Sequence, residues 1–340
     1  MYTVSRKRKA EVQVGCPFAK RKDVGIQCSE SRGSYGRNEE STILTYDQLR
    51  EKYLWSKDHT LYWLKEEGLI ASRRVCDVCQ SSMNWVECDD RSDGFVWQCR
   101  KQIGKKRHRV EKSIREGSWF EKSNFSIEEV IKFTYWWCQG LDQWQIKQQL
   151  GLGSHTAVDW DMFCRELCEV TIFEKRERLG GPGKVVQIDE TKIGKRKYHR
   201  GHVVEGQWVF GGIEQDSRKC FIVTVEDRTE ATLVSHIQEW VEQGTTIVSD
   251  CWKGYVNLEK YGYEHKTVNH SVEFVSPEGY DTNKIEGHWR QMKVSLPTHG
   301  RKKEHYASYL AEFLWRYINS GKDLFFVFLK DVASVYQFKD

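Results

Sequence analysis

The spacing of apolar and polar positions predicts helices in the first half of the chain. Between residues 45 and 70, apolar side chains recur at intervals of three, four or seven, which is the period of an α-helix. A second helix is predicted over 126–139, where Ser126 and Glu129 have the spacing of a capping box ahead of an apolar run. Both segments are therefore expected to pack a hydrophobic face against neighbouring elements.

A helix-turn-helix pattern follows directly. A short helix is predicted over 143–150, a tight turn at Gly151–Gly153, and a longer helix to about residue 173. In DNA-binding examples, the N-terminal end of the second helix meets base edges, and His155 stands at that end here. A plain helical hairpin that fills a core is the alternative interpretation.

The pattern changes to strands after the Gly-Gly-Pro-Gly segment at 180–183, which is a domain boundary signal. Thr229 precedes a helical pattern that lies between the third strand and the last one. The predicted strands are 185–188, 207–213, 220–225 and 245–249, with a hairpin at 215–218. Three strands, a helix and a strand indicate an α/β fold with a mixed sheet, in which the helix is a crossover that lets the last strand run parallel to the first.

Composition indicates an intracellular protein with local basic clusters. The 340 residues are 39% hydrophobic and 30% charged, and no apolar run reaches the roughly 20 residues that span a bilayer. Residues 1–40 are predicted to be a disordered tail. The basic knots at 6–9 and 20–22 resemble a bipartite nuclear import signal, so we expect the nucleus as location, a solvated charged tail being the alternative.

Three of the eleven cysteines and one histidine have the spacing of a metal site. Cys76 and Cys79 form a knuckle whose thiolates can share one tetrahedral metal, and Cys99 lies at the distance along the chain that a zinc ribbon requires. His108, in a strongly basic segment predicted to be a loop, is the best fourth ligand, and Cys88 is the fallback. The prediction is a structural Zn²⁺; unligated core cysteines are the alternative. The basic segment around His108 is a plausible DNA contact.

Two predicted strands end on an aspartate. Asp189 follows the strand 185–188 and Asp250 follows the strand at 245–249, so parallel neighbours would bring both carboxylates to one edge of the sheet. Two close carboxylates repel unless one is protonated or a cation bridges them. Hard cations such as Mg²⁺ prefer carboxylate oxygens and substrate phosphates.

A third acid is available on a predicted helix. Asn283, Glu286, Arg290 and Lys293 follow one another at steps of three and four, so they share one helix face. A solvated surface has the same pattern. The order strand-Asp, strand-Asp, helix-Glu nevertheless points to a common site for Asp189, Asp250 and Glu286.

With these motifs in place, the sequence resembles the Merlin-type DDE transposases, which are related to bacterial insertion-sequence (ISXO-like) transposases. The resemblance runs from about Tyr46 to the C-terminal helices. It is carried by Cys76-x-x-Cys79 with Trp97-Gln98-Cys99, by Lys112-Ser113-Ile114-Arg115 with Ser118-Trp119-Phe120, by Ile188-Asp189-Glu190-Thr191-Lys192, by Ser249-Asp250-Cys251-Trp252-Lys253-Gly254-Tyr255, and by Thr282-Asn283-Lys284-Ile285-Glu286-Gly287-His288-Trp289. One departure is Asp281, where family members often carry histidine.

The resemblance implies an RNase H-like catalytic domain in which Asp189, Asp250 and Glu286 bind two Mg²⁺ (or Mn²⁺) ions. In related bacterial enzymes the third position can be an asparagine, so Asn283 is a possible neighbour or substitute. The implied reaction is two-metal phosphoryl transfer: DNA at the transposon end is cut, and the freed 3′-hydroxyl joins target DNA. The implied partners are double-stranded DNA, both the terminal inverted repeats and the target, and further copies of the chain; no membrane is implied.

Basic residues follow Asp189 along the chain, and two more share the predicted helix face of Glu286. Contact with the phosphate backbone is expected for Lys192, Lys195, Arg196, Lys197, Arg200, Arg290 and Lys293, in addition to His155. A charged hairpin that faces water is the alternative for the first five. Trp252 and Trp289 flank the later carboxylates, where they either pack the core or stack on an unpaired base.

The predicted domains are a tail (1–40), an N-terminal helix with a zinc-ribbon-like module (41–115), a helical DNA-binding region (116–180) and the catalytic domain with C-terminal helices (181–340). Two other functions remain open at this stage. One is a DNA-binding protein derived from a transposase that no longer uses catalysis, and the other is an RNase H-like nuclease that only hydrolyses.

Overall fold

The computed structural model describes residues 26–28, 43–194, 206–269, 275–276, 278–297 and 303–338. These fall into two compact units, which we describe separately. The ribbon unit comprises described residues 46–132 and 332–338. The sheet unit comprises the remaining described residues, up to 331. Among the described residues, no helix is long and apolar enough to cross a membrane.

The ribbon unit consists of two helices and a three-stranded antiparallel sheet in the order β2-β3-β4. The helical pattern over 45–70 forms two helices rather than one, because the Ser56 hydroxyl accepts the backbone N–H of His59 at 3.2 Å and starts a new helix there. His108 lies in strand β4, not in a loop, since β4 pairs with β3 along its whole length. The elements are α1 (Tyr46–Tyr53), α2 (Lys57–Glu66), β2 (Asn84–Glu87), β3 (Phe95–Ile103) and β4 (Lys106–Ser113).

The predicted helices after residue 126 are confirmed. Helix α3 (Ile127–Cys138) begins at the predicted capping box, in which the Ser126 hydroxyl accepts the Glu129 N–H at 3.1 Å and the Glu129 carboxylate accepts the Ser126 N–H at 2.8 Å. Helix α4 (Gln143–Leu150) ends at Gly151, whose φ of 64° requires the left-handed region that glycine tolerates. Helix α5 (Ser154–Glu174) follows directly.

The sheet unit is built on a six-stranded mixed sheet in the order β1-β8-β7-β6-β10-β11. The predicted parallel pairing of the first and last strands is confirmed, because β6 and β10 pair in parallel with Val185 opposite Thr246. The predicted hairpin is confirmed as the antiparallel pair β7–β8. The strands are β1 (Ile26–Cys28), β6 (Val185–Ile193), β7 (Gln207–Glu214), β8 (Cys220–Val225), β10 (Thr246–Asp250) and β11 (Glu264–Val268).

Two expectations about this sheet need correction. The first strand does not end at Ile188, because β6 continues through both acids to Ile193 and pairs with β7 throughout, with Asp189 opposite Gly211. In addition, Ile26–Cys28 pairs antiparallel with β8, so three residues of the tail expected to be disordered form strand β1. The two basic knots at 6–9 and 20–22 lie outside the described residues.

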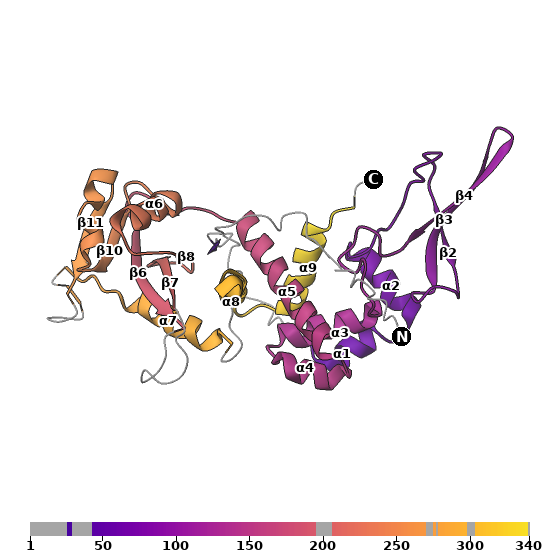
Figure 1. The fold of residues 1–340 in the computed structure, drawn as a ribbon, viewed down its shortest axis with the longest axis horizontal. Helices are drawn as coiled ribbons and strands as arrows, with labels where there is room; N and C mark the ends of the chain where they lie inside the picture. The colour runs from indigo at the N-terminus through magenta and orange to yellow at the C-terminus, as the bar shows by residue number, and fades with distance from the viewer. Residues whose placement is uncertain are drawn as a thin grey trace, which may run out of the picture. The chain divides into compact units, whose positions relative to one another are not determined.

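The two faces of the sheet carry different layers (Figure 1). Helix α6 (Glu230–Trp240), which Thr229 caps as predicted, covers one face and packs against a core that includes Val186, Ile188 and Ile247. Helix α7 (Asn283–Ser295) covers the other face. Because side chains alternate along a strand, Gln187 and Asp189 of β6 point to the α7 face, as does Asp250 of β10. The two predicted acids are therefore on the same face of the sheet.

The remaining helices build an aromatic core beside the sheet. Helix α8 packs on α5 and on strand β8. Trp137, Trp315 and Phe328 lie with ring centroids 5.3 to 6.1 Å apart. The other elements of the unit are α8 (Tyr306–Ile318), α9 (Leu324–Val335), the two-residue strands β5 (Leu179–Gly180) and β9 (Val241–Glu242), and the 3₁₀ turns η2 (Lys253–Tyr255), η3 (Leu258–Tyr261) and η4 (Lys303–His305).

Candidate functional site

Asp189 is a half-buried carboxylate held by a tryptophan of the helix above it. The indole Nε1 of Trp289, on α7, donates a hydrogen bond to Asp189 Oδ2 at 2.9 Å. Burial and the nearby charges of Glu190 and Asp250 together raise the pKa of Asp189 to about 7, although hydrogen bonds from the Glu190 backbone and from Trp289 oppose the rise. The site therefore resists negative charge at this position unless a cation compensates it.

Gly211 makes room for that tryptophan. It lies directly opposite Asp189 on β7, and a Cβ atom at this position would come within 2.6 Å of the Trp289 ring and 2.7 Å of the Phe221 carbonyl oxygen. Neither contact is possible without a shift of the strand or the ring. The absence of a side chain at Gly211 thus sets how closely α7 approaches the strand that carries Asp189.

Asp250 is the last residue of β10 and is fixed by the chain that follows it. Its Oδ1 accepts the backbone N–H of Trp252 at 3.0 Å. The parallel register places Val248 opposite Gln187, so two further residues along each strand lead to Asp250 and Asp189. The two carboxylates repel each other, since the charge of Asp250 contributes to the raised pKa of Asp189.

Glu286 lies on the exposed side of α7, one turn before Trp289. The Thr282 hydroxyl donates to Glu286 Oε1 at 3.1 Å. Asn283, Arg290 and Lys293 are exposed on the same side, whereas Ile285, His288, Trp289 and Met292 are buried. The predicted shared face of these four polar residues is confirmed, and it carries one carboxylate and two cations.

Three polar contacts hold the start of α7 against the sheet. The side-chain oxygen of Gln187, two residues before Asp189, accepts the Ile285 N–H at 3.1 Å. The Lys284 ammonium donates to the Glu214 carbonyl oxygen at 2.9 Å, at the end of β7. The Asp281 carboxylate accepts the Asn283 N–H at 2.8 Å and so satisfies a free donor in the first turn of the helix. The position of Glu286 therefore depends on the same strand as Asp189.

Glu190 points to the opposite, α6 face and was not assigned a role from the sequence. The buried Tyr255 hydroxyl donates to Glu190 Oε1 at 2.5 Å. Burial raises the pKa of Glu190, and this hydrogen bond opposes the rise. A buried tyrosine partner was not recognisable in the sequence because Tyr255 lies 65 residues away.

A stack of two tryptophans and an arginine lies on that same face. The Arg228 guanidinium is 4.1 Å from the ring centroid of Trp208 and 4.4 Å from that of Trp252, and the Lys192 ammonium lies 5.3 Å from the Trp208 centroid. Trp252 therefore packs on a cation, and the Trp289 ring packs on the sheet at Gly211. Lys195, Arg196, Lys197 and Arg200 lie outside the described residues.

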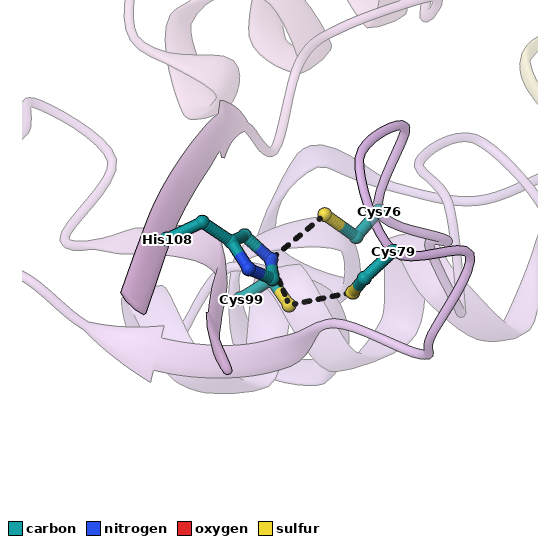
Figure 2. Close-up of side chains that lie close together, drawn as sticks. All are labelled: Cys76, Cys79, Cys99 and His108. Atoms are coloured by element: carbon teal, nitrogen blue, oxygen red, sulfur yellow. Dashed lines mark hydrogen bonds between the residues drawn. The ribbon is translucent and has the colours of Figure 1, made fainter. Parts of the chain in front are cut away.

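In the ribbon unit, Cys76, Cys79, Cys99 and His108 converge (Figure 2). Cys76 Sγ is 3.6 Å and Cys99 Sγ 3.3 Å from His108 Nε2, and the sulfurs of Cys79 and Cys99 are 3.5 Å apart. A tetrahedron with metal–sulfur bonds of about 2.3 Å and a metal–nitrogen bond of about 2.0 Å has edges of about 3.5–3.8 Å. The four side chains can therefore hold one metal ion. Cys88, the fallback ligand, is not in the cluster.

The thiols of this cluster differ in acidity. Hydrogen bonding from Ser81 lowers the pKa of Cys79 to about 6, and burial raises the pKa of Cys99 to about 11. A bound cation would stabilise all three thiolates at once, because metal coordination deprotonates a thiol outright. His108 was placed correctly from its spacing, although its strand was not predicted.

The helix-turn-helix candidate keeps its predicted residue at the surface. His155 is exposed in the first turn of α5. Ser154 beside it accepts a hydrogen bond from the Lys147 ammonium at 2.7 Å, which ties the first turn of α5 to α4. The N-terminal end of α5 is therefore accessible to a partner such as DNA.

Comparison with known proteins gives two matches. Residues 178–317 match the family model described as the ISXO2-like transposase domain. A protein of Haemophilus influenzae described as an "Uncharacterized transposase-like protein" is 33% identical over 103 residues, which are 30% of this chain and 83% of that protein. The segment matched by the family model contains Asp189, Asp250 and Glu286.

Proposed function

Since the chain belongs to the ISXO2-like transposase family, we propose that it is a DDE transposase that cuts transposon-end DNA and joins the freed 3′-hydroxyl to target DNA. The family relation implies a DNA-processing enzyme that binds DNA. The finer assignment to the Merlin type, which the sequence motifs suggest, is part of the proposal.

One observation carries the assignment of the active site to Asp189, Asp250 and Glu286. Both aspartates lie on one face of the sheet, and the helix that bears Glu286 is hydrogen-bonded to Asp189 through Trp289. A half-buried carboxylate beside a second one, with a raised pKa, fits a site for hard divalent cations. Bound Mg²⁺ or Mn²⁺ supplies charge neutralisation at the attacking and leaving oxygens of the phosphate. The protein positions the acids and the DNA.

The fold supports an RNase H-like assignment for this unit. Three antiparallel strands, β6 to β8, are followed by helix α6 and by β10, which is parallel to β6. We propose that the catalytic domain covers 181–340 and that a helical DNA-binding region over 116–180 precedes it. In this proposal the segment 41–115 is a zinc-ribbon-like module, in which Cys76, Cys79, Cys99 and His108 hold a structural Zn²⁺ that cross-links the knuckle to strands β3 and β4.

DNA contacts are proposed at the exposed or half-buried basic residues around the acids. Arg290 and Lys293 share the face of Glu286, and Lys192 follows Asp189 on β6. Lys195, Arg196, Lys197 and Arg200 follow on the chain, and His155 lies at the start of α5. The proposal further includes nuclear import through the basic knots at 6–9 and 20–22, and assembly of two or more copies on paired transposon ends.

A strand-transfer assay with labelled end DNA and Mg²⁺ tests the function. The expected result is cut ends and end–target joints from the wild type. Asp250→Asn removes one acid at nearly constant volume, so it should abolish both products while DNA affinity stays near the wild-type value. Full activity of this variant would refute the active-site assignment.

The same assay distinguishes the two other functions. Nicked DNA without joined products identifies a nuclease that only hydrolyses. DNA binding without cutting, by a wild-type protein that retains its zinc, identifies a domesticated DNA-binding protein. The candidate end sequences are the short inverted repeats expected on either side of the gene.

A further inference from the structure

Arg228 packs against two tryptophan rings. It lies in the short segment between β8 and α6, and the central carbon of its guanidinium is 4.1 Å from the ring centroid of Trp208 and 4.4 Å from that of Trp252. Contact with two rings restricts the rotation of the side chain and leaves its N–H groups able to bind other partners. The stack therefore orients the hydrogen-bond donors of one arginine.

The stack is tied to the acidic site through Trp252. The Trp252 indole Nε1 donates to the carbonyl oxygen of Arg228 at 3.4 Å, and its backbone N–H donates to Asp250 Oδ1 at 3.0 Å. One residue thus contacts both the second aspartate of the proposed active site and the arginine. Arg228 is thus linked to Asp250 through Trp252, while the stack itself lies on the α6 face of the sheet and the two aspartates on the α7 face.

The charge of Arg228 is not neutralised by a direct contact. Among the described residues, its guanidinium makes no hydrogen bond or ion pair; burial raises the pKa of the nearby Glu190, the charge of Arg228 opposes that rise, and the Glu190 carboxylate accepts the Tyr255 hydroxyl. Lys192 lies against the same Trp208 ring, so two cations share one indole. Two buried arginines are paired directly with acids: Arg115 with Asp93 and Arg165 with Asp161.

Two cations that contact one indole, neither of them in an ion pair among the described residues, can form a site for an anion. The edge of a guanidinium matches two oxygens of a phosphate, and arginine binds phosphates in this bidentate manner more readily than lysine does. We propose that Arg228, with Lys192, binds a backbone phosphate of the DNA strand that passes the acidic site. This inference rests on the proposed function and adds a residue that neither the sequence motifs nor the matches assign.

Salt-dependent DNA binding tests the contact without any catalysis. Arg228→Gln removes the charge and keeps a planar amide between the rings; Arg176→Gln is the matched control, because the exposed Arg176 guanidinium also stacks on an aromatic ring, that of Phe173 at 4.2 Å. Affinity for duplex DNA is measured over a range of NaCl concentrations without Mg²⁺, using the zinc-loaded full chain. Arg228→Gln should bind several-fold more weakly and reduce the slope of log affinity against log salt by about one, the change for one lost phosphate contact.

Neutral methylphosphonates locate the phosphate. Methylphosphonates are placed at one position at a time along the end DNA. At the phosphate that Arg228 contacts, the methylphosphonate should weaken binding of the wild type but should not weaken binding of Arg228→Gln any further. Such non-additivity shows that the two groups interact. If Arg228→Gln melts like the wild type and keeps the wild-type salt slope, as Arg176→Gln should, the inference is wrong. Arg228→Lys gives a second test, since it retains the charge and should retain the slope.

The test of the Arg228 contact and the test of the transposase function can give different results. An unchanged salt slope together with end–target joints from the wild type overturns only the role of Arg228. A reduced slope without any cutting supports the phosphate contact and contradicts the transposase assignment. Absence of DNA binding by the wild type overturns both.

Discussion

The two candidate metal sites of this protein are held together in different ways. In the ribbon unit, four donor atoms already lie at the distances of one coordination sphere, all within 4.8 Å of one another. In the sheet unit, two aspartates share a face of the sheet and the third acid stands on an exposed helix side. The first arrangement is closed and suits a structural ion, whereas the second leaves room for a substrate.

The difference also concerns what positions the ligands. The Cys–His cluster joins a knuckle at 76–79 to strands β3 and β4, so the ligands themselves connect the elements. The acids are positioned by packing and hydrogen bonds that do not involve the metal, chiefly the Trp289–Asp189 contact and the space at Gly211. Metal loss should therefore unfold the first site and leave the second largely intact.

The largest expected effect is on the ribbon unit. Cys76→Ser should abolish zinc binding and the order of residues 71–115, since structural zinc contributes on the order of 10 kcal/mol to small modules. Limited proteolysis and the zinc content of purified protein measure this. Cys88→Ser is the matched control because Cys88 lies outside the cluster. Equal protease patterns for the two variants would contradict the structural role of the zinc.

The second prediction concerns the packing that positions the acids. Gly211→Ala forces Trp289 or strand β7 to move, and displacement of catalytic groups by about 1 Å costs roughly 10²-fold in rate. Gly287→Ala is the control, because no atom lies within 4 Å of the added Cβ. Strand transfer should fall for the first variant and persist for the second. Equal activities would show that Trp289 is not positioned by Gly211.

A smaller effect is expected from Trp289→Phe. This change keeps an aromatic ring on Gly211 and removes the hydrogen bond to Asp189 Oδ2. Loss of a hydrogen bond that orients a metal ligand typically costs about 10- to 100-fold in metal affinity or activity. The Mg²⁺ concentration for half-maximal cutting should rise while zinc content stays unchanged. An unchanged Mg²⁺ requirement would assign Trp289 to packing alone.

The smallest effect is on the pH dependence of stability. The pKa of Asp189 in the folded protein, about 7, is above its ordinary value of 3.8, so the folded state holds the proton more tightly than the unfolded state. The contribution to stability is present below pH 4 and is lost as the pH rises to about 7. The stability of Asp189→Asn relative to the wild type should therefore grow by about 1 kcal/mol per pH unit up to pH 7 and then stay level.

Chemical denaturation without Mg²⁺, between pH 5.5 and 8.5, measures this trend. The exposed Asp216 provides a control variant, Asp216→Asn, for which no such trend is expected. Saturating Mg²⁺ should flatten the fall of the wild-type curve below pH 7, because a bound cation favours the ionised carboxylate. A pH-independent difference between Asp189→Asn and the wild type would contradict the burial of this carboxylate.

The sequence predicted elements whose signals are local. The capping box at Ser126, the glycine turn at Gly151 and the cap at Thr229 each specify a helix start or end within a few residues. Parallel pairing of β6 with β10 followed from the order of strands and the crossover helix. The gathering of Cys76, Cys79, Cys99 and His108 followed from ligand spacing.

Features that depend on partners distant in the chain were missed. Strand β4 is rich in charged residues and has no apolar alternation, so its sequence does not indicate a strand. It forms a strand because it pairs with β3 along its whole length. Strand β6 continues past Asp189 because β7 supplies a partner for each residue. The Arg228 stack joins residues from three segments, and no local pattern announces it.

The missing side chain at Gly211 has a consequence for reading related sequences. Under the proposed function, a sequence that preserves all three acids but has a larger residue at 211 would pass a motif search and still transfer strands more slowly, because its helix α7 could not approach the sheet as closely. Intact acids alone are therefore an insufficient criterion of an active enzyme, and position 211 should be inspected with them.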